Sequence, residues 1–399
     1  MITLIIGMLP FLMVLGNSML IPLLPQYEGE LNLTSPQASI ILSIFSIPAA
    51  LIIPFAGFLS DRYGRRKLIL ISMAVITIGA LLCILSGFIN KGAAYHTLLA
   101  GRFIQGLGTG GTTPLAMALI GDVFIGEERS RQLGILEGFN GFAKVVAPIA
   151  GAVLALFSWY APFFIFPVIG VLTGAGIFLL IKKAPSGDKT IKFNDYLSNI
   201  GKVVKREKGW LFAAYLYGGT GLFLLYGLLY YLAYLIEETY HIDGFFKGFS
   251  FAFPLISMTI TSYWTGRKIK TDHHLMKQYL AVGSLMMFVS FMCVIVFQNF
   301  SFLLFFLTVG FGGLGFILPC INTFITSSVK DSERGFVVGL YGLARFSGVA
   351  LGPIVYSVWM NTPEQMFLYS FILLAFSQAL FWISFYRKKI QQLLSAKFS

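Results

Sequence analysis

The chain of 399 residues is divided into long apolar segments, and this pattern limits its possible folds more than any other feature. A helix needs about 20 apolar residues to span a bilayer. Twelve segments of this kind cover residues 3–25, 36–59, 68–89, 96–120, 131–157, 162–181, 210–236, 246–266, 275–297, 301–327, 336–358 and 365–386. No stretch alternates with the period of two that barrel strands require. The sequence therefore predicts an all-α membrane protein with twelve transmembrane helices.

The composition agrees with this prediction. Charged residues make up 12% of the chain, hydrophobic residues make up 57%, and the mean hydropathy is +0.80. Soluble domains carry about 25% charged residues, so this chain cannot cover a soluble surface. The formal net charge of +12 comes from short basic clusters between apolar segments, which are typical of membrane topology signals and not of a nucleic-acid surface. We expect a multi-pass protein of the cell membrane that binds no nucleic acid.

The basic residues also predict the orientation, because cytoplasmic loops are enriched in Lys and Arg. With the N-terminus inside, the cytoplasmic loops and the C-terminal tail hold 24 of the 29 Lys and Arg residues. The outer loops hold only Lys91 and Lys247. Both termini are therefore expected in the cytoplasm.

The second half of the chain repeats the first. A shift of 205 residues aligns Pro114 with Pro319, Glu128-Arg129 with Glu333-Arg334, Gly134 with Gly339, and Pro148 with Pro353. We expect two pseudo-symmetric six-helix bundles, residues 1–183 and 209–399, joined by a cytoplasmic linker at 184–208. The linker has the pattern of a basic amphipathic helix on the inner leaflet, either a plain tether or a regulatory docking site. A substrate path between the halves is the usual consequence of such a repeat.

Three stretches resemble motifs of a known family. Gly57–Lys67 reads GFLSDRYGRRK and resembles the GxxxDRxGRRK signature of the major facilitator superfamily, and Arg102–Gly108 resembles its RxxQG pattern. Ala143–Ala152 resembles the gxxxGPxxGG motif of drug and metabolite antiporters. The resemblance covers the whole chain and is strongest for the twelve-helix, proton-coupled exporters of bacteria. Lys144 stands where that motif has an uncharged residue, and uptake is therefore the alternative direction of transport.

The resemblance implies a cytoplasmic latch between the halves at the first of these motifs. Its expected members are Gly57, Asp61, Arg62, Gly64, Arg65, Arg66 and Asp122. The residues themselves indicate that Gly57 and Gly64 permit a sharply turned backbone and that Asp61 pairs with Arg65 or with a helix end. The alternative is that the basic residues only set the topology.

Charges at bilayer depth are costly and usually face a cavity or a partner. The sequence places Arg102, Glu137, Lys144 and Arg345 inside helices. Glu137 is the only carboxylate well inside a helix, so we expect it to couple transport to protons together with Arg102. A static Glu137–Arg102 clamp is the alternative.

Three deep basic residues against one acid favour an anionic or polyphenolic solute, because a buried charge needs a counter-charge. In the alternative, Arg345 pairs with Glu333 or Asp331 near the loop. Tyr226, Tyr230 and Tyr234 form a stripe on the seventh segment, as a substrate pocket or as an interfacial belt. The residues expected to bind substrate are Asn17, Gln105, Asn140, Lys144, Phe223, Tyr226, Tyr230, Asn322, Tyr341 and Arg345.

These observations predict a secondary transporter that exports an organic, anionic or amphipathic solute against protons by alternating access. A lipid or glycolipid flippase on the same fold, or a non-transporting scaffold or sensor, is the alternative. The sequence has no nucleophile elbow, Walker loop or metal-ligand spacing, and we expect no enzymatic activity, no cofactor and no metal. The expected partners are the solute, protons and membrane lipids, and the expected state is a monomer.

Overall fold

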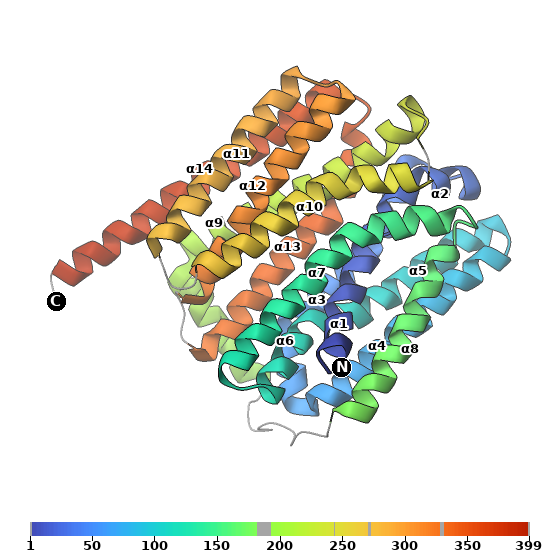
Figure 1. Cartoon of the computed structure of the whole chain (residues 1–399). Helices are drawn as coiled ribbons and strands as arrows, with labels where there is room; N and C mark the ends of the chain where they lie inside the picture. Colours follow the sequence, from blue (N-terminus) through green and yellow to red (C-terminus); the bar gives the residue numbers. More distant parts are fainter. Residues whose placement is uncertain (1, 182–192, 243, 270–272, 328–330, 398–399) are drawn as a thin grey trace.

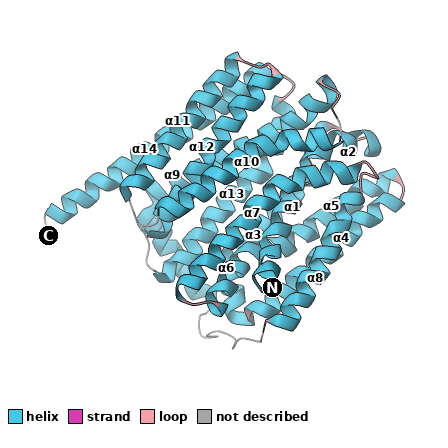
Figure 2. Cartoon of the chain, in the orientation of Figure 1, coloured by secondary structure: helices cyan, strands magenta, loops and turns pink. Residues whose placement is uncertain are grey.

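The structure is a computed structural model that describes residues 2–181, 193–242, 244–269, 273–327 and 331–397. Throughout this part of the chain, helices are joined by short loops and no strand is present (Figure 2). The linker residues 184–192 lie outside the described residues, as do the side chains of Asp61, 193–208 and 331–334.

The first half of the chain forms eight helices. They are α1 (Ile2–Ser18), α2 (Leu24–Leu31), α3 (Ser35–Tyr63), α4 (Arg65–Leu85), α5 (Lys91–Thr109), α6 (Thr112–Val123), α7 (Gly126–Ala155) and α8 (Ile165–Leu180). Short 3₁₀ turns at Ile21–Leu23, Ser86–Phe88 and Ala161–Phe164 connect some of them.

The second half contains six long helices. They are α9 (Phe193–Tyr234), α10 (Gly244–Ile269), α11 (His273–Val296), α12 (Phe300–Ser327), α13 (Asp331–Trp359) and α14 (Pro363–Lys397). Residues 193–208, which were assigned to the linker, form the first turns of the continuous helix α9. A π-helical turn at Leu235–Thr239 extends the other end of α9.

Ten helices within the described ranges are long and apolar enough to cross a membrane. The two expected segments that do not meet this criterion are 96–120 and 246–266. The first is divided between α5 and α6 by a break at Gly110-Gly111. The second is α10, which is rich in Ser and Thr and ends on basic residues.

The helices of each half pack mainly on one another, and two long helix pairs form the main contacts between the halves. In the first half α4 packs on α5 and α8, and α1 packs on α7; in the second half α9 packs on α13, and α12 packs on α10 and α11. The joining pairs are α3 with α13 and α7 with α10. Figure 1 shows the blue-to-green helices of the first half beside the yellow-to-red helices of the second. A site between the halves therefore has these two seams as its side walls.

Candidate functional site

Arg102 lies in the interior of the first half. Its side chain is 0% exposed, and its guanidinium lies over the Phe45 ring, 4.2 Å from the centroid. Nη2 donates to the Gly16 carbonyl at 2.7 Å, Nε donates to the Ile41 carbonyl at 3.2 Å, and Nη1 donates to Oε1 of Gln105 at 2.9 Å. Arg102 thus ties α5 to α1 and α3.

Glu137 is not among these partners, and its side chain is exposed on α7. The Glu137–Arg102 clamp considered from the sequence is therefore not what the structure shows. The clamp is absent because the donors of Arg102 bind two backbone carbonyls and a side-chain amide. These partners are uncharged, so the charged residues of the sequence do not indicate them.

The basic loop after α3 makes its described contacts within the first half. Gly64 has φ +89°, a left-handed conformation that favours glycine. Arg65 forms a 2.9 Å ion pair with Asp122 and donates to the Ala118 carbonyl, which joins α4 to α6. Arg66 donates to the Phe178 carbonyl on α8 at 2.6 Å. Since the side chain of Asp61 is outside the described residues, a latch between the halves stays a prediction.

The sharp turn expected at both glycines of this motif occurs only at Gly64. Gly57 lies inside α3, and a Cβ atom there would meet no atom within 4 Å. The expectation for Gly57 is therefore wrong, because α3 continues for two more turns before the loop. The guanidinium of Arg62 lies 5.8 Å from the ring centroid of Tyr63.

The stretch Ala143–Ala152 lets α7 pack closely on two neighbours. A Cβ atom on Gly151 would lie 2.0 Å from the Met19 carbonyl oxygen, just after α1. A Cβ atom on Gly248 of α10 would lie 2.8 Å from the Cα atom of Ile149. Ala143 and Ala147 are both fully buried. Small residues in this stretch therefore let the backbones of neighbouring helices approach closely.

Lys144 and Arg345 bring positive charge from the two halves toward the same region. Lys144 on α7 interacts electrostatically with Arg345 on α13 and with Glu137, which lies two turns earlier on its own helix. Both basic side chains are partly buried. Two bases and one acid leave this region with net positive charge, and we call these three residues the charge cluster.

Aromatic side chains of α9 and α13 lie beside Arg345 of the charge cluster. The Arg345 guanidinium lies 5.5 Å from the ring centroid of Tyr341, which stacks on Tyr215 of α9 at 6.0 Å. The Tyr341 hydroxyl, Arg345 Nε and Asn140 Oδ1 are buried, and none of these atoms has a hydrogen-bond partner in the described part of the chain. Unpaired buried polar atoms are costly, so a polar ligand that pairs with them would be favoured here.

The tyrosine stripe of α9 crosses to the first half. Tyr226 hydrogen-bonds to Ser18 at 3.1 Å, and Tyr230 donates to the Ser35 carbonyl at 2.7 Å. Tyr234 donates to the Glu28 carboxylate and lies 3.1 Å from the Tyr230 hydroxyl. We call these three tyrosines and their first-half partners the tyrosine seal. The tyrosine seal joins the two halves at the end of the molecule opposite the basic loops. A substrate role of Tyr226 and Tyr230 stays a prediction.

The other expected substrate residues separate into two groups. Asn17 and Gln105 are buried in the first half, where Asn17 accepts a 3.0 Å hydrogen bond from Ser46. Phe223 packs edge-on against Tyr356 of its own half. Asn140 on α7 and Asn322 on α12 are partly buried. Of the expected substrate residues, Lys144 interacts with Arg345 across the halves, and Arg345 lies over the Tyr341 ring. Asn140 lies one turn before Lys144 on α7.

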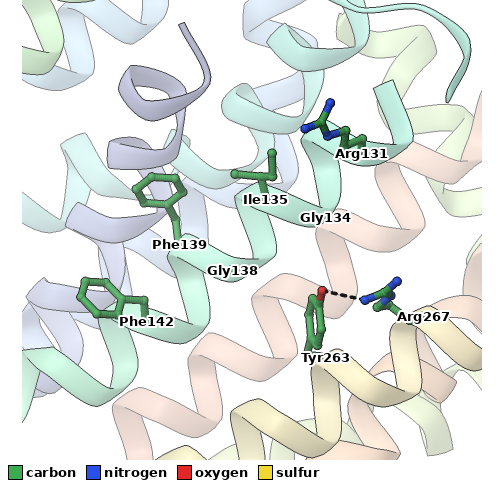
Figure 3. A pocket seen from close by; sticks show the side chains of 8 residues that line it. All are labelled: Arg131, Gly134, Ile135, Gly138, Phe139, Phe142, Tyr263 and Arg267. Atoms are coloured by element: carbon green, nitrogen blue, oxygen red, sulfur yellow. Dashed lines mark hydrogen bonds between the residues drawn. The ribbon is translucent and has the colours of Figure 1, made fainter. Parts of the chain in front are cut away.

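A cleft of about 760 Å³ opens between α7 and α10 at the end that carries the basic loops, which we call the basic end. It is lined by Arg131, Gly134, Ile135, Gly138, Phe139, Phe142, Tyr263 and Arg267 (Figure 3). The two helices still touch at Gly141, where a Cβ atom would lie 2.3 Å from Thr259. From there toward the basic end they separate.

The equivalent seam of the other pair is closed. Gly339 on α13 corresponds to Gly134 on α7 by the 205-residue repeat. A Cβ atom on Gly339 would lie 2.8 Å from the Cα atom of Pro54, whereas one on Gly134 would meet no atom within 4 Å. With the tyrosine seal closed, the opening between the halves in the described region is at the basic end, along α7 and α10.

The model of the major facilitator superfamily matches residues 6–353, which is most of the chain. This protein belongs to the major facilitator superfamily. Members of this family are transporters and not enzymes, and the apolar helices make this one a multi-pass protein of the plasma membrane.

Curated relatives of this transporter are bacterial. It is 35% identical over 369 residues to the bacillibactin exporter of Bacillus subtilis (strain 168), covering 92% of this chain and 91% of the relative. It is 28% identical over 173 residues to the multidrug resistance protein MdtL of Salmonella paratyphi B (strain ATCC BAA-1250 / SPB7). That match covers 43% of this chain and 42% of the relative.

Solved structures share the fold of this transporter. A bacterial homologue of the human lysosomal transporter Spinster, inward-facing and occupied, has a TM-score of 0.75 at 15% identity, covering 96% of each chain. The human organic anion transporter MFSD10 has a TM-score of 0.67 at 19% identity, covering 94% of this chain and 98% of that one.

Sequence reasoning missed two sets of residues. It took Arg131 and Arg267 only as topology signals, and it gave no role to Glu28 or Ser18. Arg267 follows Tyr263 and Trp264 by about one helical turn, which was an available signal for the cleft. The partners in the tyrosine seal lie about 200 residues from their tyrosines, and only the packing of the two halves shows them.

Proposed function

We propose that this transporter exports an organic solute with acidic and hydroxyl groups in exchange for protons, by alternating access. In this proposal all twelve segments cross the membrane, the basic end and both termini are cytoplasmic, and the protein works as a monomer. The charge cluster carries the proposal, because it joins a base from each half in one electrostatically coupled region. The name of the 35% identical relative, a bacillibactin exporter, supports export of an organic solute.

The charge cluster also accounts for exchange of solute against protons, as opposed to cotransport. Exchange requires that the solute and the proton do not bind at the same time. Acidic groups of the solute would pair with Lys144 and Arg345, while a hydroxyl group donates to the ionised Glu137 carboxylate. A proton on Glu137 occupies the same oxygen and weakens solute binding. A proton that binds Glu137 from outside would then release the solute there, and the protonated, solute-free protein would return and release the proton inside.

The first experiment compares solutes of opposite charge. Everted membrane vesicles with an imposed pH gradient are tested with bacillibactin and with ethidium, in wild type, Lys144→Gln and Arg345→Gln. Each variant removes one positive charge from the cluster, so accumulation of bacillibactin should fall at least about tenfold, an effect of about 1.4 kcal/mol. Lys268→Gln is the control, because it removes an exposed positive charge that lies outside the charge cluster. Ethidium transport that is indifferent to both cluster variants, without bacillibactin transport, would contradict the proposal.

The second experiment separates coupling from movement of the solute. Glu137→Gln preserves the shape and the acceptor oxygen but cannot take up a proton. It should lose transport driven by a pH gradient while keeping downhill exchange of preloaded solute. Unchanged pH-driven transport by Glu137→Gln would move the coupling role to another group.

The open cleft between α7 and α10 favours a lipid or glycolipid flippase as the second candidate, because a lipid could enter the site sideways. Flipping of a fluorescent phospholipid in proteoliposomes, measured by dithionite quenching, tests it. A rate equal to that of protein-free liposomes would remove this candidate.

A further inference from the structure

The cleft between α7 and α10 changes in chemistry along its length. Away from the basic end its wall is aromatic and aliphatic: Phe142 is 60% exposed and Ile135 is 37% exposed. Phe142 also stacks on Phe11 of α1, with ring centroids 6.3 Å apart. An exposed aromatic wall on a membrane helix is a natural surface for an acyl chain.

At the basic end the cleft carries one arginine from each half. The side chain of Arg131 on α7 is 74% exposed, and it forms a 3.6 Å ion pair with Glu128 of its own helix. Arg267 on α10 donates to the Tyr263 hydroxyl at 3.2 Å, and its guanidinium lies 5.6 Å from the centre of that ring. Figure 3 shows both guanidinium groups at the cleft, with the glycines of α7 between them and the phenylalanines. A guanidinium has five N–H donors in a fork that matches phosphate oxygens.

The apolar-to-cationic order of these walls matches a lipid of the cytoplasmic leaflet. If the basic end is cytoplasmic, as proposed above, the arginines lie at the depth of the headgroups and the phenylalanines at the depth of the acyl chains. The cytoplasmic leaflet carries a negative surface potential that attracts such residues.

We propose that the cleft binds one anionic phospholipid of the inner leaflet, with its phosphate between Arg131 and Arg267 and an acyl chain along Phe139 and Phe142. The lipid is a resident of the cleft and is not the transported solute.

The repeat gives this site a conformational consequence. The two arginines belong to opposite halves, so the lipid bridges them only while α7 and α10 are apart at the basic end. The equivalent seam is filled at Gly339 and has no room for a lipid. Since a ligand shifts an equilibrium toward the state that it binds, the lipid holds the inward-open state.

The test uses the purified full-length protein and native mass spectrometry from mixed micelles. The probes are phosphatidylglycerol and phosphatidylcholine at equal concentration. Wild type should retain one phosphatidylglycerol in preference to phosphatidylcholine, and Arg131→Gln/Arg267→Gln should lower that retention at least about tenfold. The matched control Arg129→Gln/Lys268→Gln removes the same charge from the same helix ends outside the cleft lining, and it should retain the lipid.

A second variant guards against misfolding of the arginine double variant. Gly134→Leu fills the cleft, where a Cβ atom meets no atom within 4 Å, and leaves every charge in place. It should lose phosphatidylglycerol while keeping the thermal stability of wild type. Equal retention of phosphatidylglycerol by the cleft variants and by the control, or equal retention of the two lipids by wild type, would overturn the proposal. Lys144→Gln should keep the lipid, so failure of the lipid site and failure of the proposed solute site are distinguishable.

Discussion

The Tyr230 hydroxyl donates a 2.7 Å hydrogen bond to the Ser35 carbonyl, and so joins α9 of the second half to the first turn of α3. Tyr226 and Tyr234 make equivalent bonds one turn away on either side, to Ser18 and Glu28. Three bonds at a spacing of four residues form a single line across the boundary between the halves. All three bonds of the tyrosine seal must therefore break together before the transporter can open at the end opposite the basic loops.

We expect that Tyr226→Phe/Tyr230→Phe/Tyr234→Phe shifts the protein toward the state open at the seal. Each lost hydrogen bond contributes about 1 kcal/mol, so the loss of all three changes the ratio of the states by about 100-fold. Spin labels at Gly29 and Glu238, both exposed, report the opening as a longer distance in double electron–electron resonance.

Tyr231→Phe is the matched control for the tyrosine seal. Tyr231 lies on the same helix, but its ring packs edge-on against Phe367 of its own half at 5.6 Å. It should leave the distance distribution unchanged. A triple variant with the wild-type distribution would show that the seal does not hold this end closed.

Arg102→Gln should destabilise the protein instead of uncoupling it. The substitution strips the carbonyls of Gly16 and Ile41 of a charged donor in a fully buried region. Hydrogen bonds to charged groups contribute about 1.5–3 kcal/mol each, so the melting temperature in detergent should fall by several degrees. Arg102→Lys should not restore it, because an ammonium cannot reproduce the three-way fork.

Glu137→Gln is the comparison for Arg102, because the Glu137 side chain is exposed and should leave the melting temperature within about one degree of wild type. An Arg102→Gln protein with wild-type stability and altered pH dependence of transport would return Arg102 to the coupling role.

The contrast between Arg102 and Lys144 shows what the sequence could predict. Apolar length was enough to place Arg102 and Lys144 inside long helices. The sequence pattern could not show which face of a helix packs within its own half and which face is directed toward the other half. Arg102 lies on the first kind of face and Lys144 on the second, although the two read alike in sequence.

The break between α5 and α6 is a similar case. The stretch Gly106–Pro114 contains four glycines and ends on proline, which are ordinary signs of a helix interruption. A single apolar span over 96–120 was expected because hydrophobicity averages over such a break. The tyrosine seal had no local sign in the sequence, because its partners are distant from the tyrosines. They are the Ser18 hydroxyl, the Ser35 carbonyl and the Glu28 carboxylate on α2.

Asp122→Asn tests how firmly the basic loop is anchored. The Arg65–Asp122 pair is 2.9 Å long, with side chains that are 25% and 39% exposed. Partly exposed pairs contribute up to about 1 kcal/mol, so the loss of unfolding free energy should be small. The transport rate should fall more than stability does, because the pair fixes α4 and its loop to α6. A wild-type rate in Asp122→Asn vesicles, with Arg65→Gln equally active, would show that this anchor has no part in transport.

The repeat supplies a pair of substitutions that differ only in the seam they enter. Gly134→Ala places a methyl group in the open cleft, meets no atom within 4 Å, and removes a helix-interior glycine. Glycine costs about 0.5–1 kcal/mol relative to alanine in a helix, so this variant should melt at or slightly above the wild-type temperature.

Gly339→Ala places its methyl group 2.8 Å from the backbone of Pro54, and α13 must move away from α3. Overpacking of this kind costs about 1–3 kcal/mol, so the melting temperature should drop and the α3–α13 seam should loosen. Equal melting temperatures for the two variants would mean that the seams are equally tight in the membrane, and that the one-sided opening along α7 and α10 is not the resting state of the protein.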